Sequence, residues 1–203
     1  MNDKVTIYIV RHGESVSNVK GVVAGHADYE LTEEGEQQAR ILGEKLKHVH
    51  FDQVFSSDLI RAKRTAELIT LEKKLAIETT QVLRERNYGN FEGKTHKDLF
   101  ALFDSWNHLS YKQRLKQRPA ENAESDEEVL ARFITFLREI SVTYPKKTIL
   151  VSTHGGIMHA FLGHVSGKDR VQSVRNAAWL KVESDGVNFE VIETEGIIFE
   201  NES

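Results

Sequence analysis

Two histidines, two arginines and one glutamate stand at positions that suit phosphoryl transfer: His12, His154, Arg11, Arg61 and Glu85. Each lies at the end of a predicted strand or in the turn that follows it. The carboxyl ends of neighbouring strands share one edge of an open α/β sheet, and ligands bind at that edge. We therefore expect these five side chains to converge on one site.

The residue types agree with an anionic substrate. Phosphoryl transfer needs mainly charge stabilisation, and arginine supplies permanently charged, bidentate donors, so Arg11 and Arg61 are candidate phosphate ligands rather than surface salt-bridge partners. A neutral imidazole can act as a nucleophile near pH 7, which makes His12 the candidate. His154 precedes Gly155 at a predicted helix start, where free backbone N–H groups favour an anion; the alternative is a core histidine.

Two further polar residues leave alternatives open. Glu85 lies between Arg84 and Arg86, so it is either a proton donor or an ion-pair partner of an arginine. A general acid must hold a proton near neutral pH, and a neighbouring anion favours the protonated form of a carboxyl group. Asn18 is either a neutral donor to the phosphate or an ordinary turn residue.

Separated motifs extend this pattern: Arg11-His12-Gly13 with Asn18, Ser56–Ala62, Leu83–Gly93 and Val151–Gly156. In this order and spacing the chain resembles the histidine phosphatase superfamily, from about residue 6 to residue 164. The resemblance implies that His12 carries the phosphoryl group and that Glu85 donates the proton to the leaving oxygen. It also implies that Arg86 and Tyr88 shape the substrate pocket, with Gly25 and Gly155 contributing to the phosphate site.

Hydrophobic periodicity predicts the elements that position these residues. Apolar runs predict buried strands, and stripes at helical spacing predict amphipathic helices, two of them with N-caps at Thr32 and Ser125. The expected strands are 5–10, 51–55 and 148–151; the expected helices are 33–47, 59–69, 126–144 and 155–163; the expected hairpin is 174–182 with 187–192. Ser56 to Asp58 is predicted as a turn, and the stripe that includes Phe103 and Trp106 is predicted to be core packing.

This alternation predicts an α/β fold, a three-layer α/β/α sandwich with a mainly parallel central sheet and an antiparallel edge. The resemblance adds a small helical insertion. We expect one histidine phosphatase domain over 1–203, with an insertion or lid at about 86–124. The basic stretch 109–122 within it is either a mobile excursion or a solvated linker.

Composition and short motifs limit the partners, the location and the cofactors that we expect. The formal charge of −4 argues against nucleic-acid binding, and no apolar run reaches membrane-spanning length. With 0 cysteines and no room for a signal peptide before the first strand, we expect a cytoplasmic protein without membrane contact. No His-Glu-x-x-His pattern occurs, so we expect neither a catalytic metal nor another cofactor. The oligomeric state cannot be read from the sequence.

The leading hypothesis is a metal-independent phosphatase that hydrolyses phosphomonoesters of small metabolites through a phosphohistidine. The first alternative is a phosphoglycerate mutase, but the family's adjacent arginines are absent from Lys112–Arg118. A catalytically silent phospholigand-binding module is a further alternative, disfavoured because both nucleophile and acid are retained. The substrate stays open, with a weak preference for sugar bisphosphates.

Overall fold

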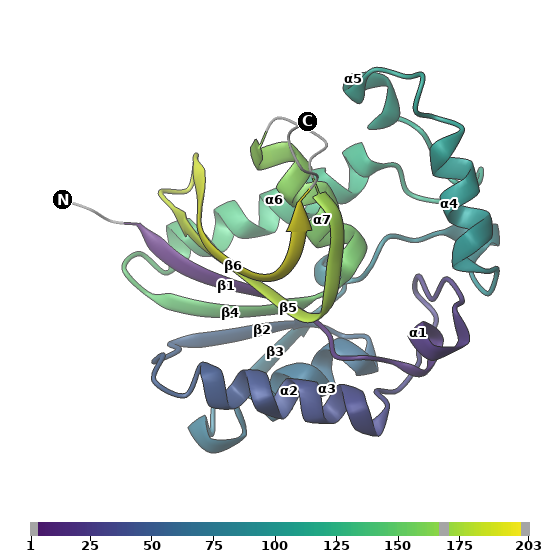
Figure 1. Ribbon diagram of the computed structural model, residues 1–203. Coiled ribbons are helices and arrows are strands. Elements are labelled where there is room, and N and C mark those ends of the chain that lie inside the picture. Colours follow the sequence, from purple (N-terminus) through teal and green to yellow (C-terminus); the bar gives the residue numbers. More distant parts are fainter. Residues whose placement is uncertain (1–3, 167–170, 200–203) are drawn as a thin grey trace.

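Among residues 4–166 and 171–199, which the computed structural model describes, six strands form one sheet (Figure 1). They are β1 (Val5–Arg11), β2 (Gln53–Ser57), β3 (Ile77–Thr80), β4 (Thr148–Thr153), β5 (Val171–Ser184) and β6 (Phe189–Phe199). Their order across the sheet is β3-β2-β4-β1-β5-β6. The first four strands in that order are parallel, whereas β5 and β6 are antiparallel to their neighbours. The predicted mainly parallel sheet with an antiparallel edge is confirmed.

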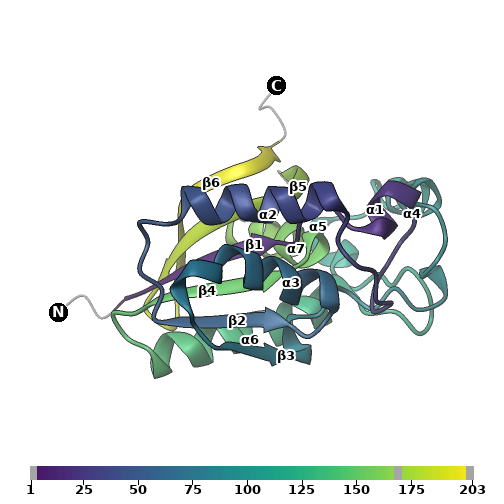
Figure 2. The same ribbon diagram turned by 90° about the horizontal axis from the view of Figure 1, so that it is seen from below.

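Helices cover both faces of this sheet. Helices α2 (Glu33–Lys45) and α3 (Ile60–Ile69) lie on one face and stand in front of the strands in Figure 2. Helices α6 (Asp126–Thr143) and α7 (Gly155–Ser166) lie on the other. Side chains of β1 alternate between the two layers: Ile7 and Ile9 belong to the core with α6 and α7, whereas Tyr8 packs in the core with α2 and α3. The three-layer sandwich is thus confirmed.

Two predicted helix N-caps are confirmed, whereas the predicted bounds of the second strand are wrong. Thr32 caps α2 by accepting from the Gly35 N–H at 3.0 Å, and Ser125 forms a capping box with Glu128. The second strand, however, is Gln53–Ser57 and not 51–55. Ser56 and Ser57, predicted as part of a turn, therefore belong to this buried strand, because they pair with Thr79 and Thr80 of β3.

The remaining helices lie beyond the carboxyl edge of the parallel strands. They are α1 (Val16–Lys20), α4 (His96–Asp104) and α5 (Tyr111–Arg114), seen at the right of Figure 1. Short 3₁₀ turns occur at Leu71–Lys73, Gln81–Leu83 and Gly89–Phe91. Val23, Tyr88 and Leu99 form a small apolar cluster of their own there. This cluster joins the loop after β1 to α4, so both segments border the same edge of the sheet.

Candidate active site

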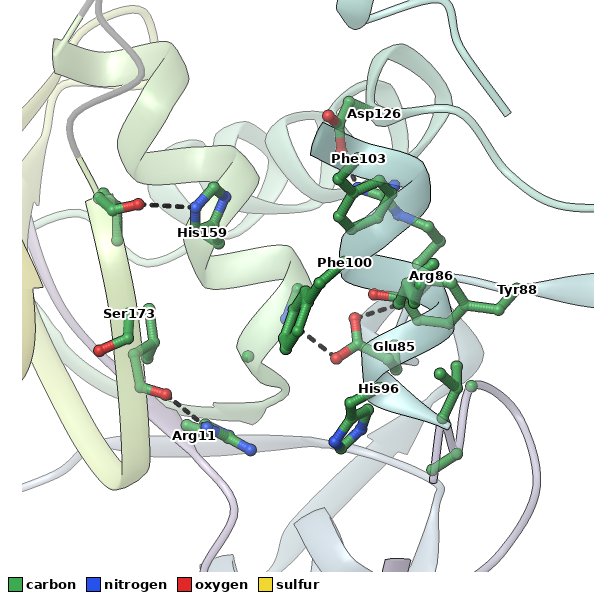
Figure 3. Close-up of a pocket in the computed structure, with 18 of the residues that line it drawn as sticks. Arg11, Glu85, Arg86, Tyr88, His96, Phe100, Phe103, Asp126, His159 and Ser173 are labelled. Atoms are coloured by element: carbon green, nitrogen blue, oxygen red, sulfur yellow. Dashed lines mark hydrogen bonds and ion pairs between the residues drawn. The ribbon is translucent and has the colours of Figure 1, made fainter. Parts of the chain in front are cut away.

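A cavity of about 640 Å³ opens at the carboxyl edge of the parallel strands. Sequence-predicted site residues line it: Arg11, His12, Asn18, Gly25, Arg61, Glu85, Arg86, Tyr88 and Gly155. Several of them are labelled in Figure 3. His154 lies buried beside His12, with their ring centroids 5.2 Å apart. The structure therefore brings all the predicted residues together, from the segments that follow β1, β2, β3 and β4.

His12 is held in one orientation and one tautomer. Its side chain is only 4% exposed, and Nδ1 lies 2.7 Å from the carbonyl oxygen of Gly13. Since a carbonyl oxygen only accepts, Nδ1 must carry the proton and Nε2 keeps its lone pair. The Gly13 N–H in turn donates to Thr65 Oγ1 at 3.0 Å, which ties this turn to α3. His12 thus presents a nucleophilic nitrogen from a fixed backbone.

Electrostatics keep both imidazoles neutral. Burial, and then the positive charges of Arg61 and Arg11, hold the pKa of His12 well below its ordinary value of 6.5. Burial and Arg61 likewise hold the pKa of His154 well below that value. Both ring nitrogens of His154 are buried without a hydrogen-bond partner among the described residues. A neutral His154 can therefore donate one N–H to a bound anion.

Two guanidinium groups flank this pair. Arg61 is 1% exposed and donates to the carbonyl oxygens of Ala27 and Gly25 at 2.9 and 2.8 Å. Gly25 adopts φ +52°, and a Cβ there would lie 2.0 Å from Glu92 Oε1, so this position requires glycine. Arg11 Nη1 donates to the Val174 carbonyl oxygen, while its buried Nε has no partner among the described residues. Arg11 also lines the cavity, so its positive charge can attract an anion there.

The Glu85 carboxylate is oriented by backbone amides. Its Oε2 accepts from the Gly156 N–H at 2.9 Å and its Oε1 from the Arg86 N–H at 2.8 Å. A Cβ at Gly156 would lie 2.5 Å from Oε1, so the glycine allows this close approach. The neighbouring arginines pair elsewhere, Arg84 with Asp58 and Arg86 with Asp126. Glu85 is therefore held in place by the two N–H groups, and the ion-pair interpretation with Arg84 or Arg86 is not supported.

Asn18 is oriented by a residue that sequence reasoning missed. Its Oδ1 accepts from the Ser15 N–H at 3.0 Å and from Asn176 Nδ2 at 3.1 Å. With donors on the oxygen, the amide NH₂ of Asn18 is left to donate to a ligand. Asn176 belongs to β5, where the pairing with β6 is irregular between Val174 and Trp179. No local pattern distinguishes this asparagine, because its partners are 158 or more residues away.

Arg86 and Tyr88 form the wall beside Glu85. The Arg86 guanidinium pairs with Asp126 and lies 5.5 Å from the Tyr88 ring centroid and 5.8 Å from that of Phe103. Burial, and then the nearby Glu85, raise the pKa of Tyr88, so its hydroxyl stays protonated. The wall continues into α4, and Phe103 and Trp106, predicted as core packing, line the cavity instead. An apolar stripe on a helix does not reveal whether it faces a core or a cavity.

Neither a metal cluster nor a membrane span is found in the part of the chain that the structure describes. Within residues 4–166 and 171–199, no three His, Cys, Asp or Glu side chains are grouped so that they could hold a metal ion. No helix in these same ranges combines the length and apolar character needed to cross a membrane.

The comparisons with known proteins identify the family. The model of the histidine phosphatase superfamily (branch 1) matches residues 7–195. The chain therefore belongs to the histidine phosphatase superfamily, an α/β family of the phosphoglycerate mutase-like fold.

Individual relatives make this assignment more specific. The chain is 35% identical over 173 residues to the "Uncharacterized phosphatase PhoE" of Bacillus subtilis, covering 83% of this chain and 82% of that protein. It is 30% identical to the adenosylcobalamin/alpha-ribazole phosphatase of Escherichia coli, covering 79% of each. A solved structure titled phosphoglycerate mutase from Bacillus anthracis superposes with a TM-score of 0.85 at 28% identity, covering 96% of this chain and 94% of that one. A relative named as a mutase reaches a similar identity: the 2,3-bisphosphoglycerate-dependent phosphoglycerate mutase of Cytophaga hutchinsonii is 30% identical to this chain over 163 residues.

Proposed function

We propose that this protein is a metal-independent phosphatase that hydrolyses phosphomonoesters of small metabolites through a phosphohistidine at His12. The observation that carries the proposal is the hydrogen bond between His12 Nδ1 and the Gly13 carbonyl oxygen, 2.7 Å long. It leaves Nε2 as a neutral nucleophile inside a cavity whose arginines attract a phosphate. Arg11 and Arg61 would supply the charge stabilisation that phosphoryl transfer requires.

In the first step, His12 Nε2 attacks phosphorus and the bond from phosphorus to the ester oxygen breaks. Glu85 gives its proton to that oxygen, so the alcohol leaves neutral. Arg11, Arg61, Asn18 and His154 would donate to the anionic oxygens of the transferring group. The neighbouring N–H of Gly156, at the start of α7, fixes the carboxyl group that delivers the proton.

In the second step, water attacks the phosphohistidine and the phosphorus–nitrogen bond breaks. The Glu85 carboxylate, now without its proton, accepts a proton from the attacking water. Inorganic phosphate is released, and His12 regains the lone pair on Nε2. The cycle therefore returns both groups to their starting protonation states, and neither step requires a metal ion.

The segment at about 86–124 supports a substrate-enclosing role. Its residues Arg86, Tyr88, Phe103 and Tyr111 line the same cavity as His12. The backbone of the preceding loop is bonded to it, with the Val23 N–H donating to the Lys94 carbonyl oxygen at 2.8 Å. We therefore assign to this segment, as an insertion in a single domain, the outer wall of the substrate site.

The mutase alternative has less support. Of the basic side chains in Lys112–Arg118, only Arg114 lines the cavity. Arg118 is directed elsewhere, donating to the Ala123 carbonyl oxygen and pairing with Glu128. A phosphoglycerate carboxylate would therefore lack the adjacent pair of arginines that mutases of the family use to hold it. A silent binding module would not need both Glu85 and His12.

Phosphate release from a panel of small phosphomonoesters in the presence of EDTA tests the proposal. We expect turnover that EDTA leaves unchanged and that His12→Ala abolishes. His48→Ala is the matched control, because His48 is exposed and lies outside the cavity. Turnover that survives in His12→Ala, or that EDTA removes and added metal restores, would contradict the proposal.

A further inference from the structure

The cavity extends beyond the phosphate-binding end into a largely aromatic region. Six side chains from the segment that contains α4 and α5 line it: Leu99, Phe100, Phe103, Trp106, Tyr111 and Leu115. Phe100 and Phe103 project from α4 toward the cavity (Figure 3). The organic part of a substrate whose phosphate lies at His12 would therefore meet these rings.

The aromatic region is held by a fixed helix. Thr95 and Asp98 form a capping box at the start of α4, and Leu99 anchors the helix in the cluster with Val23 and Tyr88. Phe100, one residue further, is 58% exposed although it is a large apolar side chain. When an apolar ligand covers an aromatic ring that is exposed at the border of a binding cavity, the burial of the ring surface stabilises the complex.

Charges in this region compensate one another. The Arg86 guanidinium pairs with Asp126, and the other two charged residues of this part of the lining, Arg114 and Asp104, carry opposite signs. Burial, and then Arg11, lower the pKa of His96, so this imidazole is neutral at pH 7. In contrast to the phosphate-binding end with its two arginines, this region offers no net charge to a second anionic group.

We propose that the preferred substrates are phosphomonoesters of bulky, uncharged and largely apolar alcohols, whose organic group packs against Phe100 and Phe103. This inference rests on the proposed phosphatase activity and selects among its substrates. It disfavours bisphosphates and phosphorylated carboxylic acids, because a second anion would lose hydration in the aromatic region without gaining a counter-charge. The buried Tyr111 hydroxyl has no hydrogen-bond partner among the described residues, so it can form one hydrogen bond with a polar group of the alcohol.

Matched phosphate esters test the inference. Ethyl and hexyl phosphate have leaving groups of nearly equal acidity, so their kcat/KM values differ through binding of the chain. Burial of a methylene is worth roughly fourfold, so even partial burial of four extra methylenes predicts at least about a tenfold preference for hexyl phosphate. A hexyl chain that ends in a carboxylate should lose that preference.

Variants locate the effect. Phe100→Ala should reduce the hexyl-to-ethyl ratio at least about fivefold, since part of the covering surface is lost. Val142→Ala is the matched control, because Val142 is 73% exposed on α6 and lies outside the cavity. The control should keep the wild-type ratio. A wild-type ratio near one, or a ratio that Phe100→Ala leaves unchanged, would overturn the inference.

A binding measurement separates this inference from the proposed activity. Hexylphosphonate and ethylphosphonate cannot be hydrolysed, and calorimetry should show tighter binding of the hexyl compound by the same factor of about ten or more. Tighter hexyl binding without turnover of any ester would refute the phosphatase proposal and keep the aromatic subsite. Turnover with equal binding of both phosphonates would refute the subsite and keep the phosphatase.

Discussion

Replacing Glu85 by glutamine removes the proposed acid while keeping the shape of the side chain. Both carboxylate oxygens accept backbone N–H bonds, from Arg86 and from Gly156. The amide of glutamine has only one acceptor, so one of these N–H groups must face an NH₂ group. The loss of one satisfied bond costs about 1–3 kcal/mol of unfolding free energy. The variant should therefore still fold, with its melting temperature lowered by several degrees.

The effect on rate should depend on the leaving group. General acid catalysis contributes about 10²- to 10⁴-fold, and we expect a loss of this size for an alkyl phosphate. The acidic phenol of an aryl phosphate leaves readily as an anion, so the variant should hydrolyse this ester less than about tenfold more slowly than the wild type. Glu85→Gln should consequently show a steep new dependence of rate on the pKa of the leaving alcohol or phenol.

Single-turnover formation of phosphohistidine is the assay, because it excludes the later activation of water by the same carboxylate. Glu124→Gln is the matched control: Glu124 also accepts a backbone N–H, from Asn87 at 2.8 Å, but lies outside the cavity. The control should lose stability and keep the wild-type dependence on leaving-group pKa. If Glu85→Gln and wild type show the same dependence, Glu85 is not the acid.

Three further variants test the supporting contacts. Thr65→Val leaves the buried Gly13 N–H without its acceptor and should lower the free energy of unfolding in urea by about 1–3 kcal/mol. Thr65 also donates to the Arg61 carbonyl oxygen of its own helix, as exposed Thr135 does to that of Ala131, so Thr135→Val is the control and should cost less than about 0.5 kcal/mol. Burial lowers the pKa of His154, so the unfolded chain binds more protons than the folded one and the free energy of unfolding falls as the pH drops below 6.5. His154→Gln should weaken this fall. An equal slope of unfolding free energy against pH in variant and wild type, between pH 7 and 5, would contradict the prediction. Asn176→Ala should lower kcat/KM about tenfold, with little further loss when Asn18→Ala is added; full additivity would exclude a positioning role.

Much of the fold and the site follows from local sequence. The apolar run Val5–Val10 predicts a buried strand, and its register places Arg11 opposite Thr153 at the end of β4. Because these strands are parallel, Arg11, His12 and His154 must share one edge of the sheet. The parallel arrangement explains why the sequence alone predicts that His12 and His154, more than 140 positions apart, lie in one site.

Other features depend on contacts that no local pattern encodes. Asn176 orients Asn18 only because β5 returns beside β1, and Thr65 supports Gly13 only because α3 packs against the turn after β1. The stripe with Phe103 and Trp106 has helical spacing in either environment, so its periodicity could not separate a core face from a cavity wall. Long-range packing, and not propensity, decides these three features.

The formation of phosphohistidine at His12 is the central claim, and a brief incubation with substrate labelled in its phosphoryl group tests it most directly. Rapid quenching should leave label on the protein that is labile in acid and stable in base, as expected for a phosphorus–nitrogen bond. His12→Ala should retain no label, while His48→Ala should be labelled like the wild type. Equal labelling of wild type and His12→Ala would contradict the account.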